Sequence, residues 1–296
     1  MIKKIIVMNL LFLIVIGCTR TSEPTHNALQ QANGNGVTNN KQPEAADSST
    51  PEVINIHEKI DIGGYGLVVK ISGIKSSYPV IVFESGFGGT SDTWERLQSE
   101  LSKRTLTVSY DRAGLGRSSS SPGPRTSEVK AMELHKLLQQ CQIEGPFIIV
   151  AHSLGGFTAR IFATKYKEEV KGIVFVDSSY EQQFVDSPEP QYEEGSLEEM
   201  MNNANPDGSY DEMLLSAKQV TVSKAEDALR KIPIDVLVGL NDKSDGASVW
   251  LGYQQEIAKL SDKSNMLTID AGHGIHIEQP DFVIQEITNM MEGKYD

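Results

Sequence analysis

Cysteine is scarce in this 296-residue chain, which has only Cys18 and Cys141. Two cysteines cannot supply the disulfide framework on which small secreted domains depend. Cys18 ends an amino-terminal apolar run, so cleavage of that run would leave Cys141 without a chain partner. Cys141 lies in an apolar-periodic stretch, and we expect it to be a buried, unreactive small residue. The hydrophobic core alone must therefore hold the fold.

Basic charge is also in short supply. The chain has 27 Lys and Arg against 40 Asp and Glu, and its formal net charge is −13. No block of five basic residues offsets this acidity, so nucleic acid and an anionic bilayer surface are excluded as expected partners. The chain also lacks HExxH and CxxC motifs, and we expect no metal site. The stretch Gly114–Ser119 only loosely resembles a dinucleotide fingerprint because a third glycine is missing, so no cofactor is expected either.

Long hydrophobic runs are limited to the amino terminus. Lys3 and Lys4 precede an apolar run from Ile5 to Ile16 that Asn9 alone interrupts. The run is too short to span about 30 Å of hydrocarbon, yet it suits a secretory signal. It ends in VIGC, which resembles the bacterial lipobox.

The lipobox resemblance implies a lipoprotein signal peptide at residues 1–17, with acyl chains such as palmitate attached to Cys18. An ordinary signal peptide with an incidental cysteine is the alternative. Residues 18–52 are rich in Asn, Gln, Ser, Thr, Pro and Gly, and we predict a flexible linker there. The protein is then expected at the bacterial cell membrane, lipid-anchored and facing outside the cytoplasm.

From residue 53 onward the chain alternates between short apolar runs and helix-period stretches. Two strands flanking Gly63-Gly64 predict a hairpin. The following strands are expected near Val80–Phe83, Leu106–Tyr110, Phe147–Val150, Ile173–Val176, Ile234–Val238 and Met266–Ile269. Helices are expected near Thr93–Ser102, Ser127–Gln140, Phe157–Tyr166 and Trp250–Leu260. This alternation predicts an α/β domain over 53–296, with a mostly parallel sheet covered by helices on both faces.

One segment interrupts this rhythm. Residues 178–232 contain no convincing strand and hold twelve acidic residues against four basic ones. Met and Leu residues at 200, 201, 213, 214 and 215 indicate short amphipathic helices. We expect this insertion to be a helical cap over a site at the sheet rather than a separate domain.

The stretch AHSLGG, from Ala151 to Gly156, follows the apolar run that ends at Val150. A strand, a sharp turn and a helix would place the hydroxyl of Ser153 at the carboxyl end of the sheet, beside unpaired amides of the helix. The alternative is a purely structural turn. We take Ser153 as the candidate nucleophile.

A serine nucleophile needs a base and a carboxylate that orients it. His273 lies between two glycines after the last expected strand, and it is the preferred base; His276 is expected to pack or support, and His152 to point elsewhere. Asp242 follows the strand at 234–238 and is the preferred carboxylate, on the chain order of the three residues and its place in a turn. Asp177, at the end of the preceding strand, is the alternative.

Acyl transfer also needs amide donors aimed at the developing oxyanion. The N–H of Leu154 is one candidate. The second candidate is Phe87, in the glycine-rich turn ESGFGG that follows the strand at 80–83.

Taken together, these motifs resemble the α/β-hydrolase superfamily over about residues 54–294. The matching stretches are SGFGGTSDTW, YDRAGLGRS, AHSLGGFTARIFA, VFVDSS, VGLND and AGHGIHIEQP. The resemblance implies an eight-stranded sheet, a cap at 178–232, and a site composed of Ser153, Asp242, His273, Phe87 and Leu154. Ser85 and Ala151 depart from the common pattern without removing a catalytic atom, and the Asp111-Arg112 turn is assigned no chemistry.

The expected function is hydrolysis of a small or medium carboxylic ester through an acyl-enzyme, with no cofactor and a small-molecule substrate. The same groups could cleave amides, lactones or carbon–carbon bonds. A ligand-binding or signalling protein that keeps the fold with little turnover is the alternative. A purely structural surface protein is a more distant one, since it would not need these groups.

Overall fold

The computed structural model describes residues 52–185, 207–225, 227–241 and 247–294. All of them fall in one compact unit, Pro51–Asp296. The expected signal peptide, Cys18 and almost the whole expected linker lie outside the described residues. The strands are β1 (Val53–Asp61), β2 (Gly66–Ile74), β3 (Val80–Glu84), β4 (Thr107–Tyr110), β5 (Phe147–His152), β6 (Val170–Val176), β7 (Ile234–Gly239) and β8 (Ser264–Ile269).

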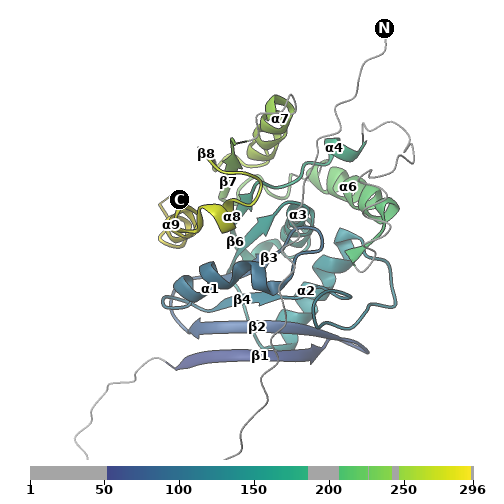
Figure 1. The fold of residues 1–296 in the computed structure, drawn as a ribbon, viewed down its shortest axis with the longest axis vertical. Helices are drawn as coiled ribbons and strands as arrows, with labels where there is room; N and C mark the ends of the chain where they lie inside the picture. The colour runs from purple at the N-terminus through teal and green to yellow at the C-terminus, as the bar shows by residue number, and fades with distance from the viewer. Residues whose placement is uncertain (1–51, 186–206, 226, 242–246, 295–296) are drawn as a thin grey trace, which may run out of the picture. The chain divides into compact units, whose positions relative to one another are not determined.

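These strands form one eight-stranded sheet in the order β1-β2-β4-β3-β5-β6-β7-β8. Strand β2 pairs antiparallel with β1, its partner in the hairpin, and antiparallel with β4. Every other pairing, from β4 through β8 in the sheet order, is parallel. Figure 1 shows the hairpin along one edge of the sheet. The mostly parallel sheet with one antiparallel edge, expected from the sequence, is confirmed.

Helices cover both faces of the sheet. They are α1 (Glu95–Leu101), α2 (Ser127–Gln140), α3 (Gly155–Lys165), α4 (Gln182–Val185), α6 (Tyr210–Ala225), α7 (Ala247–Ala258), α8 (Ile275–Glu278) and α9 (Pro280–Met291), with short 3₁₀ turns at Ser91–Trp94 and Lys167–Glu169. The connection through α1 runs from β3 toward the hairpin edge, whereas those through α2 and α3 run the other way. Because such crossovers are right-handed, α1 lies on the face opposite to α2 and α3. α1 packs on α9, and α2, α3 and α6 pack on one another.

The central strands are apolar along their whole length because both of their faces are covered. One core cluster joins Ile81 and Phe83 of β3 and Val150 of β5 to side chains of α1 and α9. Trp94, within the helix expected near 93–102, is fully buried in this cluster. Cys141 differs from its prediction: it ends α2 and is only half-buried.

The insertion at 178–232 is helical where the structure describes it. Helices α4 and α6 pack against each other, and α6 also packs on α2 and α3. Within these described parts the insertion forms no strand, as expected. Residues 186–206 lie outside the described residues. In the described chain, no helix combines the length and apolar character that a membrane crossing needs.

Candidate active site

Ser153 sits in the tight turn between β5 and α3. Its φ of +52° lies in the left-handed region, which is uncommon for a residue with a side chain and marks a locally strained backbone. The turn is possible because Gly155 follows: a Cβ at that position would lie 2.6 Å from Ser85 O and 2.7 Å from Glu84 O. The missing side chain lets the start of α3 approach the end of β3. This strained strand-to-helix turn raises Ser153 to the carboxyl edge of the sheet.

A chain of hydrogen bonds links Ser153 to His273 and His273 to a carboxylate. His273 Nε2 lies 2.9 Å from Ser153 Oγ, and His273 Nδ1 lies 2.7 Å from Asp177 Oδ2. With its proton on Nδ1 facing the carboxylate, the imidazole presents Nε2 as an acceptor to the serine hydroxyl. The arrangement can remove the hydroxyl proton and stabilise the resulting imidazolium.

The carboxylate that contacts His273 Nδ1 is Asp177, the alternative from the sequence. Asp242 lies outside the described residues, and the single Nδ1–H of His273 already has Asp177 as its acceptor. The reason is the strand order: β6 pairs directly with β5, and His152 is level with Val176. The residues that follow these two, Ser153 and Asp177, therefore emerge side by side.

His273 reaches this position because its loop crosses the end of β7. A Cβ at Gly239 would lie 2.5 Å from Gly272 O and 2.6 Å from Ala271 O, so only glycine fits beneath the crossing loop. The N–H of Asn241 also donates to Ala271 O at 2.9 Å. The loop thereby carries His273 from β8 past β7 to the ends of β6 and β5.

Asp177 is held by two further donors. Its Oδ1 accepts from Trp250 Nε1 at 2.9 Å and from Gly239 N at 3.1 Å. The Trp250 ring also meets the His273 ring edge-on, with centroids 5.7 Å apart. Trp250, which lies on the helix expected near its position, is thus a buried residue that also orients the carboxylate.

Two more imidazoles surround the loop that carries His273. His152 Nε2–H donates to His273 O at 2.9 Å, and its ring centroid is 4.4 Å from that of His276. Burial, together with the neighbouring imidazoles, holds the pKa of His152 well below its ordinary value. Burial, and then the charge of His273, lowers the pKa of His276 to about 3. Both rings are therefore neutral at physiological pH, and His152 supports the loop instead of pointing elsewhere.

The turn after β3 lies against Ser153. A Cβ at Gly86 would be 3.0 Å from Ser153 Cβ, so the backbone of this loop approaches the serine closely. Within the described chain, the amide N–H groups of Phe87 and Leu154 have no hydrogen-bond acceptor. Both residues border a small cavity of about 20 Å³ beside the nucleophile turn, enough for about one water molecule. Two unoccupied amides next to a serine hydroxyl can receive a developing oxyanion.

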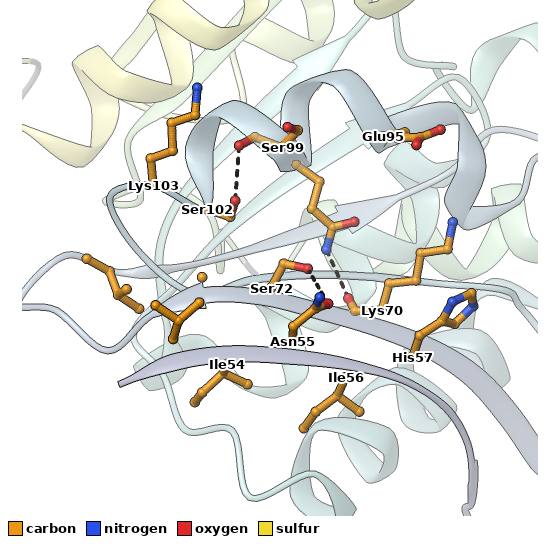
Figure 2. Close-up of a pocket in the computed structure, with 14 residues that line it drawn as sticks. Ile54, Asn55, Ile56, His57, Lys70, Ser72, Glu95, Ser99, Ser102 and Lys103 are labelled. Carbon is orange, nitrogen blue, oxygen red and sulfur yellow. Dashed lines mark hydrogen bonds between the residues drawn. The ribbon is translucent and has the colours of Figure 1, made fainter. Parts of the chain in front are cut away.

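A larger hollow, of about 670 Å³, lies elsewhere, between the hairpin and α1. Figure 2 shows Asn55 and His57 of β1 directed toward α1, and Ile54 and Ile56 directed away from it. His57, which lines this hollow, contacts the guanidinium of Arg117 and not one of the serines that line the hollow. Strands β2, β4 and β3 separate β1 from β5, so this hollow is not part of the Ser153 site.

The comparisons with known proteins agree with the fold of this chain. The family model described as "alpha/beta hydrolase fold" matches residues 79–222. This chain has the α/β-hydrolase fold. Among solved structures with this fold, a thermophilic esterase from Thermogutta terrifontis aligns with a TM-score of 0.63 and 23% identity, over 81% of this chain and 100% of the other.

Two curated proteins are also similar to this chain. The uncharacterized protein YqjL of Bacillus subtilis (strain 168) is 28% identical over 213 residues, which cover 70% of this chain and 81% of YqjL. An AB hydrolase superfamily protein of Gibberella zeae is 37% identical over 107 residues, which cover 35% of this chain and only 33% of that protein.

The α/β-hydrolase fold here also contains site residues that sequence reasoning missed. Trp250 and His152 act on the acid and on the histidine loop, and Arg112, to which no chemistry was assigned, contacts the turn after β3. Only His152, adjacent to the nucleophile, carried a local signal. In the described part of the chain, no group of three His, Cys, Asp or Glu side chains is placed to hold a metal ion.

Proposed function

We propose that the protein is a serine hydrolase that cleaves small or medium carboxylic esters through an acyl-enzyme. One observation carries the proposal: the hydrogen-bond chain from Ser153 through His273 to Asp177 at the carboxyl edge of the sheet. Two amides without acceptors in the described chain, those of Phe87 and Leu154, stand beside it.

The reaction has two halves. Ser153 Oγ forms a bond to the acyl carbon while its proton passes to His273 Nε2, and the amides of Phe87 and Leu154 bind the oxyanion. The carbon–oxygen bond to the alcohol then breaks, and His273 returns the proton to the leaving alkoxide. Water, deprotonated by the same histidine, attacks the acyl-enzyme and releases the carboxylic acid and free Ser153.

Two features support an ester as the substrate. Phe157 and Met213 border the small cavity beside the two amides and supply apolar contacts next to the expected oxyanion position. The similar structure from Thermogutta terrifontis is titled an esterase. No cofactor is needed for this chemistry.

We also propose that the enzyme is anchored outside the cytoplasm by acyl chains on Cys18. The VIGC sequence after the apolar run supports this location. Labelling growing cells with an alkyne analogue of palmitate tests it: the wild-type protein should take up label and Cys18→Ala should not. Equal labelling of the two proteins would refute the anchor at this residue.

The test of the chemistry is the intact mass of the protein after treatment with a fluorophosphonate. Ser153 should displace fluoride and gain one phosphonyl group, whereas Ser153→Ala and His273→Ala should stay unlabelled. Fast, multiple turnover on p-nitrophenyl esters of graded acyl length would then establish an esterase and rank its acyl preference. A folded wild-type protein without adduct or turnover would refute the proposal and favour a ligand-binding role.

A further inference from the structure

A buried guanidinium lies beneath the turn after β3, residues 85–89, which we call the oxyanion turn. Arg112 follows β4 and is 3% exposed. Its Nη1 donates to Glu84 Oε1 at 2.9 Å and to Ser85 O at 2.6 Å. Its Nη2 donates to Gly86 O at 2.6 Å and to Asp207 Oδ2 at 2.5 Å, and its Nε donates to Asp207 Oδ1 at 2.9 Å. All five N–H donors of this side chain therefore have an acceptor.

Asp207 connects the same turn to the insertion between β6 and β7. Beyond its two bonds to Arg112, its Oδ2 accepts from Gly88 N at 2.9 Å. Lys130 Nζ lies 3.0 Å from its Oδ1 and donates to its main-chain oxygen at 2.7 Å. Asp207 is 2% exposed. Asp207, a residue of the insertion, thus binds the N–H of Gly88, directly after Phe87. Arg112 binds the C=O of Gly86, directly before Phe87.

The hydrogen bond from Arg112 to Gly86 O sets the direction of the Phe87 amide. Gly86 C=O and Phe87 N–H belong to one trans peptide unit, in which the two groups point in opposite directions. When Arg112 holds Gly86 O, the Phe87 N–H must point away from the guanidinium. The short approach of Gly86 to Ser153 Cβ places that peptide unit at the nucleophile.

We propose that Arg112 and Asp207 are positioning residues that aim the Phe87 amide at the oxyanion, so that the site is incomplete without the insertion that carries Asp207. The inference rests on the proposed serine-hydrolase function. Neither side chain touches the substrate in this arrangement; both act through the backbone of the turn.

The opposite charges of Arg112 and Asp207 keep these contacts in place over a wide pH range. Burial disfavours both charges, but Asp207 and Glu84 together hold the pKa of Arg112 above its ordinary value. Arg112 and Lys130 outweigh burial and hold the pKa of Asp207 below its ordinary value. Both groups stay charged at neutral pH. The contribution of Arg112 and Asp207 to the reaction rate should therefore not change with pH in that range.

Two conservative variants test the proposal, Arg112→Lys and Asp207→Asn. Lysine keeps the charge but cannot hold Gly86 O and both oxygens of Asp207 with one ammonium. Asparagine keeps the shape but replaces one acceptor oxygen with a donor. Loss of one oxyanion donor lowers kcat by about 10²- to 10³-fold, and we expect each variant to lose about 10- to 10³-fold in kcat with KM within about 3-fold. The rate of inactivation by a fluorophosphonate should fall in parallel.

The matched control is Arg160→Lys. Arg160 and Glu181 form another buried pair, 2.5 Å apart, which does not contact the oxyanion turn. All rates are measured per folded molecule, below the melting temperature of each variant. The control should keep kcat within about 3-fold of wild type, and the pH profile of Arg112→Lys and Asp207→Asn should keep the apparent pKa of the base, because the contact of His273 with Asp177 is untouched.

The outcomes separate the two proposals. An unlabelled, inactive wild-type protein refutes the serine-hydrolase function itself. A labelled wild-type protein, with Arg112→Lys and Asp207→Asn labelled at the wild-type rate, refutes the positioning role alone. An equal loss of kcat in Arg160→Lys also refutes it, because a general loss of buried ion pairing would then explain the effect.

Discussion

Replacing Asp177 with asparagine tests the acid of the site. Three donors converge on this carboxylate: Trp250 Nε1 and Gly239 N on Oδ1, and His273 Nδ1 on Oδ2. An asparagine has one oxygen and one amino group for these positions. Its oxygen satisfies more donors at Oδ1, where two of them meet, so its amino group is left facing His273.

The consequence is a change of tautomer. An amino group facing His273 Nδ1 requires that nitrogen to act as an acceptor, so the ring proton moves to Nε2, which faces Ser153 Oγ. The imidazole can then no longer accept the serine proton. A carboxylate-to-amide change of this kind in a serine triad lowers kcat by about 10⁴-fold, which corresponds to about 5.5 kcal/mol in the activation free energy.

The assay is steady-state hydrolysis of a p-nitrophenyl ester, with the melting temperature measured alongside. Asp177→Asn should lose about 10⁴-fold in kcat and little in KM. Asp242→Asn is the matched comparison, an equal change at the other candidate, and should stay within about 3-fold of wild type. A loss of this size in Asp242→Asn, with Asp177→Asn fully active, would refute the assignment of the acid.

Two further changes probe the supports of the site and of the sheet. Gly239→Ala would push the His273 loop outward and should lower kcat by about 10²-fold or more. The control Gly252→Ala, in open space on α7, should leave kcat unchanged. Equal kinetics of the two variants would contradict the close passage of the His273 loop over the end of β7. Burial and then Glu286 raise the pKa of Asp235 from 3.8 to about 7. The folded state then keeps a proton that the unfolded state loses between pH 4 and 7, so stability should fall as pH rises through that window. Urea denaturation of Asp235→Asn should show no such fall in the free energy of unfolding with pH. At pH 8 the free energy of unfolding of the variant should exceed that of the wild type by at most about 4 kcal/mol. A variant whose stability depends on pH as the wild type does would contradict the raised pKa of Asp235.

The fold was predictable from the sequence because its signals are local. The apolar run at 147–150 and the helix-period stretch at 127–140 became β5 and α2 within a few residues. The insertion was recognisable because strand-like runs are missing between β6 and β7. Ser153 and His273 were found in the same way, since each lies among glycines directly after a strand run.

The acid could not be chosen on local grounds. Asp177 and Asp242 both follow a strand, and both lie between Ser153 and His273 in the chain, so chain order does not distinguish them. What distinguishes them is strand adjacency, because β6 and not β7 pairs with β5. Arg112 escaped notice for the same reason: it binds Asp207, 95 positions away, and neither residue has a local signal for the other.

The position of His273 depends on a side chain that the sequence lacks. Gly239 ends β7 with no Cβ, and this gap is what allows the loop from β8 to lie over β7 and deliver His273 to the strands beyond. Gly155 plays the corresponding part for Ser153, by admitting the end of β3 beneath α3. Each glycine marks a crossing of two backbone segments. An alanine at position 239 would place a methyl group within 2.6 Å of the carbonyl oxygens of Ala271 and Gly272, so the loop could not lie over β7 in this way. The contact of His273 with Asp177 therefore depends on the space that Gly239 leaves.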